Sequence, residues 1–486
     1  MKKLVSLFLL LVMLCSACVT GAVADDKPTL KFLISSSFFD IDGDVTAEAT
    51  QRLSGYKIDY ELLNGTDQLM LIISSGQAYD YVTLSKANYN LMMANEALAD
   101  ITDLLDQYGE HIKEGYSTLW PSVTVDGRIY AIPSTVAQPN SLNRAIVARK
   151  DLLDAIGYTS DKLPTTLDAF VKLLEDLKAA YPDMVPLTSE AHYIYTNIAS
   201  AFNVMGEQSP YQYLDGHVIS ILDNPNLEAY LTTMRDLYAR GLLDAEMPAM
   251  DKKQSQSKWA AGKAVMEYIS WNGCESYIAT LRELHPEMDF TVLPLLEDEN
   301  GKVHSQVKSG VGAYGGFPVT GENTVDAIKA INNMMEGTNY KEIVLGVEGV
   351  HYEMVNGEIQ PIQPAFTNEK NNSNSFVGGF YREDVYPTYW EVRLKKNADL
   401  ERCFFEMREK LLDGGVASPT ALAPTVTVID NLTSLEKHLS DTLISIIAGS
   451  EDMSALEAER TYWSKNGGDK AVAFYDEWYN ANVVNK

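Results

Sequence analysis

The sequence predicts an α/β fold with mixed sheets flanked by helices, and its length, composition and hydrophobic pattern each support this expectation. The chain has 486 residues, enough for two large lobes at roughly 100–200 residues per domain. Its residues are 46% apolar and 22% charged, which is typical of a globular protein and excludes a disordered or fibrous chain. Short apolar runs alternate with amphipathic segments of helical spacing, which favours mainly parallel sheets covered by helices on both faces.

This alternation is clearest in the first half of the chain. An Asp126-Gly127 pair between alternating apolar residues indicates a β-hairpin over 123–132. Residues 167–178 form the clearest amphipathic helix, because apolar side chains recur at i, i+3, i+4 and i+7. The other elements expected here are strands at 31–34, 56–63, 81–84 and 142–148, and helices at 66–74, 89–98, 150–156 and 225–240.

The second half contains a glycine-rich run at 310–315 that matches the dinucleotide-binding pattern G-x-G-x-x-G. Pro318 and Gly321 intervene before the next helix, so no helix N-terminus meets the glycines, as phosphate binding would require. We interpret the run as a tight strand between two lobes where only glycine fits. The remaining expected elements are strands at 264–266, 291–293 and 311–319, a helix at 324–335, and mostly helices from about 400 to 479.

Residues 1–24 are typical of a secretory leader. A basic start precedes an apolar run at 4–14, which is too short to cross a bilayer comfortably. An A-x-A cleavage site ends at Ala24. The Cys-Ser-Ala-Cys sequence at 15–18 resembles a bacterial lipobox, although its first position usually holds Leu. We favour lipidation of Cys18 and keep cleavage after Ala24 as the alternative.

The net charge and the cysteines argue against two further classes of protein, those that bind nucleic acid and those that hold a structural metal. The 67 acidic residues exceed the 39 basic ones, giving a net charge of −28 without the basic patch that nucleic acid requires. Beyond Cys18, the mature chain holds only Cys274 and Cys403. They could pair, but we expect two buried free thiols. Because no Cys-x-x-Cys remains, we expect no structural metal.

Motifs of known enzymes are missing from the sequence. It has no Walker loop and no G-x-S-x-G elbow, and no two of its seven histidines share the i, i+4 spacing of a zinc helix. We therefore expect no catalytic residue and no cofactor. A secreted glycoside hydrolase stays open as an alternative, because it needs only two carboxylates about 5–10 Å apart.

Aromatic residues gather with polar ones in several expected loops. The chain has 27 Tyr, 14 Phe and 6 Trp. An aromatic face suits the apolar C–H face of a sugar ring, and Asp, Asn or Arg suits its hydroxyl rim. Plain core packing is the competing explanation for each residue taken alone. The loops concerned are at 38–39, 79–81, 271–272, 380–382 and 389–390.

Six short motifs, in this order along the chain, resemble those of one family, the family 1 extracellular solute-binding proteins of bacterial ABC importers. The resemblance is strongest to the lipoprotein-type, carbohydrate-binding branch and covers nearly all of the mature chain. Each motif alone is weak evidence for the family, and the resemblance depends on finding all six in the order that the family has. They are SGQAYD at 75–80, DGRIYAIP at 126–133, VARKDLL at 147–153, LPTTLD at 163–168, AGKAVM at 261–266 and GVEGVHY at 346–352.

The resemblance implies a two-lobed fold of the periplasmic-binding-protein type, type II, with the ligand in a cleft between lobes that close over it. After the leader at 1–24, it divides the chain into an N-lobe at 27–143, a C-lobe at 144–310, a return to the N-lobe at 311–352 and a return to the C-lobe at 353–486. By residue-by-residue comparison with the family, the ligand-binding positions are Ser36, Phe38, Asp80, Trp271, Tyr314, Arg382 and Trp390.

The function that the resemblance implies is capture of a sugar or oligosaccharide and its delivery to the transmembrane subunits of an ABC permease. The protein would be an extracytoplasmic monomer, touching the membrane only through a lipid anchor. The sequence does not identify the sugar, its length or its linkage. The alternatives are the secreted hydrolase and a binder of another solute, such as a peptide or a polyamine.

Overall fold

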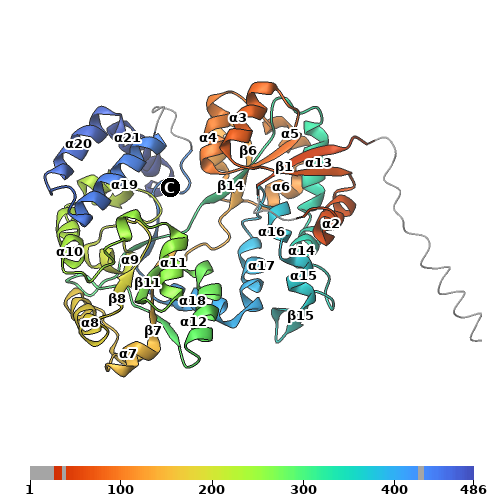
Figure 1. Cartoon of the computed structure of the whole chain (residues 1–486). Coiled ribbons are helices and arrows are strands. Elements are labelled where there is room, and N and C mark those ends of the chain that lie inside the picture. The colour runs from red at the N-terminus through yellow and green to blue at the C-terminus, as the bar shows by residue number, and fades with distance from the viewer. Residues whose placement is uncertain (1–26, 36–39, 425–431, 486) are drawn as a thin grey trace, which may run out of the picture.

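The computed structural model describes residues 27–35, 40–424 and 432–485, which form two lobes side by side (Figure 1). Each lobe is built on one mixed sheet with helices packed against it, so the expected two-lobed α/β class is confirmed. The leader at 1–24 and Cys18 lie outside the described residues. Within the described ranges, no helix is both long and apolar enough to cross a membrane.

The N-lobe sheet has the strand order β2-β1-β3-β14-β6. Strand β14 runs antiparallel to both of its neighbours, whereas β1 pairs in parallel with β2 and β3. Phe32 and Leu33 point into different apolar clusters, because successive side chains of a strand alternate between faces. Both faces are therefore buried, as in other mainly parallel sheets. The strands are β1 (Leu30–Ile34), β2 (Ile58–Leu62), β3 (Tyr81–Leu84), β6 (Ala131–Thr135) and β14 (Val311–Gly316).

Helices cover this sheet on both sides (Figure 1). Helix α4 begins at Lys86, three residues earlier than expected, because the Ser85 hydroxyl caps it by accepting the Asn88 N–H. The N-lobe helices are α2 (Val45–Ser54), α3 (Thr66–Ser75), α4 (Lys86–Ala94), α5 (Thr102–Tyr108), α6 (Glu110–Glu114), α13 (Thr324–Met334), α14 (Gly337–Leu345), α15 (Ala365–Lys370), α16 (Ser373–Phe376) and α17 (Tyr386–Val392).

The C-lobe sheet has the order β12-β7-β11-β8. Its strands are β7 (Arg144–Arg149), β8 (Val185–Thr188), β11 (Ala264–Ser270) and β12 (Phe290–Val292). Its helices are α7 (Lys150–Ala155), α8 (Leu167–Ala180), α9 (Thr196–Ala199), α10 (Leu227–Ala239), α11 (Lys252–Ala260), α12 (Cys274–Leu284), α18 (Ala398–Glu409), α19 (Leu432–Ala448), α20 (Ala455–Lys465) and α21 (Gly468–Tyr479).

Short two-stranded pairs complete the fold. The expected hairpin at Asp126-Gly127 is present, and both residues have the positive φ that its turn requires, 50° and 76°. The pairs are β4 (Thr124–Val125) with β5 (Arg128–Ile129), β9 (Tyr211–Leu214) with β10 (His217–Ser220), β13 (Ser305–Val307) with β17 (Gly415–Ala417), and β15 (Tyr352–Val355) with β16 (Glu358–Pro361).

The chain passes between the lobes at 136–143, at 308–310 and again around 393–397. The last crossing corrects the expected boundary at 352. Helices α15 and α16 pack on α2, and α17 packs on α14, so this stretch belongs to the N-lobe. Helix α18 is the first later helix to pack on C-lobe elements, namely α12 and β12. The expected return to the C-lobe at 353 therefore comes about forty residues too early by the numbering of these elements.

Cys274 and Cys403 form a disulfide, so the expectation of two free thiols is wrong. The residues are 129 positions apart in sequence, but the packing of α12 on α18 brings their Cα atoms to 6.8 Å, within reach of a disulfide. Pairing suits a protein outside the cell, where disulfides persist. Sequence spacing alone carried no signal of that helix contact.

Candidate ligand-binding cavity

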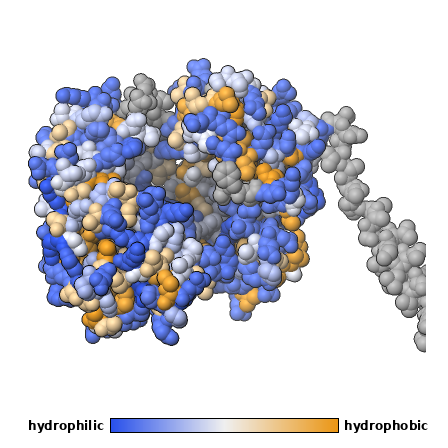
Figure 2. Space-filling model, in the orientation of Figure 1, coloured by the Kyte–Doolittle hydropathy of each residue, from blue (hydrophilic) through white to orange (hydrophobic). Residues whose placement is uncertain are grey.

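A cavity of about 530 Å³ lies between the lobes, at the carboxyl ends of β1, β3 and β6 and beside the start of β14. This is the edge at which open α/β sheets commonly bind ligands, because the loops that follow the strands leave a crevice there. Figure 2 shows the surface hollowed between the two lobes. The N-lobe and the crossing segments supply most of the wall, and Gln208 and a loop at 418–421 close it from the other side.

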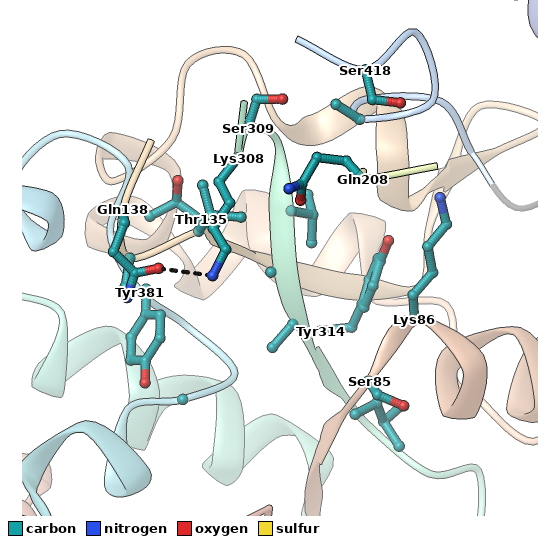
Figure 3. Close-up of a pocket in the computed structure, with 18 of the residues that line it drawn as sticks. Ser85, Lys86, Thr135, Gln138, Gln208, Lys308, Ser309, Tyr314, Tyr381 and Ser418 are labelled. Atoms are coloured by element: carbon teal, nitrogen blue, oxygen red, sulfur yellow. Dashed lines mark hydrogen bonds between the residues drawn. The ribbon is translucent and has the colours of Figure 1, made fainter. Parts of the chain in front are cut away.

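The polar part of the wall consists of hydroxyl, amide and ammonium groups (Figure 3). Hydroxyls of this kind can both donate to and accept from a ligand. The polar side chains that line the cavity are Ser35, Thr83, Ser85, Lys86, Thr135, Gln138, Gln208, Lys308, Ser309, Tyr314, Tyr381, Ser418 and Thr420.

Two tyrosines bring aromatic rings to the wall. Tyr314 on β14 stacks on Tyr89 of α4, with ring centroids 4.3 Å apart and planes 4° from parallel. Tyr381 stacks on Tyr386 in the same way, at 3.7 Å and 7°. Burial raises the pKa of both cavity phenols, so they stay neutral at physiological pH. Each stacked pair holds its ring in a fixed orientation, as a rigid stacking platform requires.

Two lysines reach the cavity from different elements. Lys86 is the first residue of α4, and its Nζ lies 3.4 Å from the Thr420 carbonyl oxygen. Lys308 precedes β14, and its Nζ lies 3.4 Å from Oε1 of Gln138, the contact dashed in Figure 3. Burial lowers the pKa of both ammonium groups.

Glycines allow the crossing segment to lie close to its neighbours. At Gly310, φ is +73° and a Cβ would stand 2.0 Å from the Ala421 carbonyl oxygen. At Gly315, a Cβ would stand 2.6 Å from the Gly379 carbonyl oxygen. The run is therefore tightly packed, as expected, but its strand β14 lies within the N-lobe sheet, and only the segment at 308–310 passes between the lobes.

The expected ligand-binding residues are distributed unevenly relative to the cavity. Tyr314 lines it, whereas Ser36 and Phe38 lie outside the described residues. Asp80 lies at the opposite, amino end of β3 and is 3% exposed. Its carboxylate accepts the backbone N–H groups of Lys31 and Asn323, at 2.9 and 2.8 Å. Asp80 therefore joins strand to loop, away from the cavity.

The remaining three expected residues form contacts elsewhere. Trp271 and Trp390 pack edge to face at 5.0 Å, and Phe404 packs against both, so the rings form a cluster at the junction of the lobes. The Arg382 side chain, 8% exposed, donates to Asp384 and to the Met335 carbonyl. None of the three is among the described residues that line the cavity.

Sequence reasoning missed Lys86, Lys308, Gln138, Gln208 and Tyr381. Lys86 carried one usable signal: it lies two residues after the buried strand β3, and ligand contacts gather where such strands end. Tyr381 adjoins the expected Arg382, and of these two side chains only that of Tyr381 is among the described residues that line the cavity. In the described part of the chain, no group of three or more His, Cys, Asp or Glu residues is placed to hold a metal ion.

The chain is similar in sequence to several curated proteins. No protein-family model matches the chain. A curated protein of Niallia circulans, described as an uncharacterized protein in the butB 5′ region, is 30% identical over 253 residues, covering 51% of this chain and 98% of that one. The lipoprotein LipO of Bacillus subtilis is 20% identical over 446 residues, covering 86% of this chain and 84% of LipO.

A solved structure shares the complete fold. The ABC-transporter substrate-binding protein FusA of Streptococcus pneumoniae, in complex with kestose, superposes with a TM-score of 0.70 at 19% identity, covering 94% of this chain and 100% of that one. The fold is thus that of a two-lobed ABC-transporter substrate-binding protein, with a cavity at the strand ends. The resemblance seen in the sequence is thereby confirmed. Within this class, the chain belongs to the same family as the Niallia circulans protein.

Proposed function

We propose that the protein captures a sugar or oligosaccharide in the cavity between its lobes and delivers it to the membrane subunits of an ABC permease. The observation that carries this proposal is the cavity itself, which combines two stacked tyrosine rings with a rim of hydroxyls and amides. Rings suit the C–H face of a sugar, and the rim suits its hydroxyl groups. The kestose complex of FusA, which has the same fold, supports a saccharide as the ligand.

Delivery depends on lobe closure. Thr83 and Tyr314 contact the cavity from the N-lobe, and Gln208 and Ser418 contact it from the opposite side. A ligand that touches both walls binds the closed state more tightly than the open one, and therefore shifts the lobes toward closure. We propose that the permease recognises this closed form of a monomer held at the cell surface by a lipid on Cys18.

We propose further that the protein binds its ligand without breaking a bond. A glycoside hydrolase needs two carboxylates on either side of the scissile bond, and the described residues that line the cavity include no Asp or Glu. The same lining argues against a polyamine, because two ammonium groups would repel it. A peptide remains the competing solute.

Calorimetric titration and thermal unfolding against a panel of oligosaccharides and peptides test the proposal. A saccharide at a hundredfold excess over Kd should stabilise the protein by about 2.7 kcal/mol, and small-angle scattering should show a smaller radius of gyration. Gln208→Ala should weaken binding, and Gln360→Ala on the distant β15–β16 hairpin should not. Stabilisation by peptides alone, or release of shorter glycans during incubation, would contradict the proposal.

A further inference from the structure

The charged residues of the cavity differ in sign from the protein as a whole. The chain carries a net charge of −28, yet Lys86 and Lys308 are the charged side chains among the described residues that line the cavity. Figure 3 shows the two ammonium groups on either side of β14, both within the close-up of the cavity. A positive site inside an acidic protein suits a ligand that carries negative charge locally.

Neither lysine is neutralised by an ion pair. Among the described residues, no carboxylate oxygen lies within 4.0 Å of either Nζ atom. Glu436 of α19 acts on the charge of Lys86 from a distance greater than that of an ion pair. The recorded neighbours of the two Nζ atoms are one carbonyl and one amide oxygen, each at 3.4 Å. Such long contacts leave most of the ammonium donor capacity unused.

The carboxylate that acts on Lys308 is already engaged. Glu207 is almost fully buried, and its oxygens lie 3.2 Å from His192 Nε2, 3.7 Å from Arg144 Nε and 2.9 Å from the Tyr268 hydroxyl. Burial alone would raise the pKa of Glu207, but His192 and Arg144 outweigh it and hold the pKa low. Arg144 and His192 therefore balance the negative charge of Glu207, so Glu207 does not neutralise Lys308.

A third donor in the cavity wall has no acceptor. The Nε2 atom of Gln208 is buried without a hydrogen-bond partner, although the backbone N–H of the same residue donates to Gln306 at 3.0 Å. A buried amide donor without a partner destabilises the unliganded protein, and a ligand acceptor would recover that loss. Ser85 and Lys86 also place the amino end of α4, with its positive dipole, at the cavity.

We propose that the ligand is an acidic saccharide, whose carboxylate or sulfate group is bound by Lys86 and Lys308. This inference rests on the proposed function and names the substrate class of the same site. A neutral sugar presents hydroxyl donors that need acceptors, and carboxylates are the strongest acceptors a wall can offer. Beside its hydroxyls and amides, the described wall offers two ammonium donors and no carboxylate acceptor, so an anionic group on the sugar completes it.

Matched pairs of probes test the inference by calorimetry. Trigalacturonic acid is compared with its methyl ester, and a sulfated galactose disaccharide with its desulfated form, so the two arms separate carboxylate from sulfate. At least one acidic probe should bind ten times or more tightly than its neutral partner. Lys86→Met and Lys308→Met should each remove most of this preference. Lys172→Met, an exposed position on α8, is the control and should keep it.

The outcomes separate this inference from the proposed function. If neutral oligosaccharides bind as tightly as their acidic partners, or if both lysine variants keep the acid preference, the inference is overturned and the proposed function stands. If no saccharide of either kind binds, both are overturned. Melting curves of the unliganded variants identify any loss that comes from misfolding, and the double arginine variant Lys86→Arg, Lys308→Arg should restore part of the preference.

Discussion

Reduction of the disulfide should destabilise the protein markedly. Cys274 begins α12 and Cys403 lies in α18, the segment with which the chain re-enters the C-lobe after completing the N-lobe. The bridge therefore closes a loop that contains β14 and helices α13 to α17. Without it, the unfolded chain gains the freedom to separate the two parts of the C-lobe, and this gain favours unfolding.

The loop length sets the size of the effect. For residues 129 positions apart, the chain-entropy relation gives about 17 cal/mol/K, or about 5 kcal/mol at 25 °C, as the loss in the free energy of unfolding. Since 1 kcal/mol shifts the melting temperature of a large domain by about 2–4 °C, the melting temperature should fall by roughly 10–20 °C.

The assay is thermal unfolding with and without dithiothreitol, with Cys274→Ser, Cys403→Ser as the matched control. Reductant should lower the melting temperature of the native protein to that of the double variant, and should leave the double variant unchanged. Alkylation of the unreduced, denatured protein should modify neither cysteine. Equal melting temperatures with and without reductant, or alkylation of both thiols before reduction, would refute the reasoning.

Three further predictions concern residues outside the cavity. Trp271→Ala should lower the free energy of unfolding by about 3–5 kcal/mol, because the ring is 8% exposed and packs on Trp390 and Phe404, and a loss of ligand binding with an unchanged melt would contradict this. Asp80→Ala should cost about 1–3 kcal/mol by leaving two backbone N–H groups without their acceptor, and titration should give an unchanged Kd. Burial raises the pKa of Glu267 to about 8, so the folded protein keeps a proton that the unfolded chain releases near pH 4.5; stability should fall as the pH rises between these values, and Glu267→Gln should reduce that slope in denaturant titrations.

The architecture could be predicted because the evidence for it is local. Short apolar runs between segments of helical spacing identified β1 and β3. The Asp126-Gly127 turn identified a hairpin without any knowledge of tertiary contacts. Errors arose where a tertiary contact decides the outcome. The return to the C-lobe at 353 was taken from the resemblance to the family, and only the packing of α15 and α16 on α2 and of α17 on α14 assigns these helices to the N-lobe.

The cavity was harder to predict, because segments that are distant in sequence meet there. Trp271 is an aromatic residue beside polar ones, as a sugar-stacking residue would be, but the packing of α17 and α18 encloses it. Apart from its place just after β3, Lys86 gave no sign that it lines the cavity, since one lysine among 39 basic residues is unremarkable until α4 is placed there. The net charge calculated from the composition is negative, whereas the charged side chains among the described residues that line the cavity are positive.

That contrast leads to a last prediction, that binding of an acidic saccharide takes up protons. Burial lowers the pKa of Lys86 and Lys308 in the free protein, and a bound anion would raise it again by favouring the charged form. The charged groups that act on the two ammonium groups are Glu436 on Lys86, and Glu207, Lys252 and Arg144 on Lys308.

The sign follows from linkage. Below the lowered pKa, both lysines are charged before and after binding, so affinity is independent of pH. Above it, part of the free protein must first gain a proton, so affinity should fall as the pH rises toward the ordinary lysine value of about 10.4. Titrations in buffers of different ionisation enthalpy should show proton uptake that grows with pH and disappears in Lys86→Met, Lys308→Met. Proton release, or the same uptake with a neutral saccharide, would show that the anion does not bind at these two lysines.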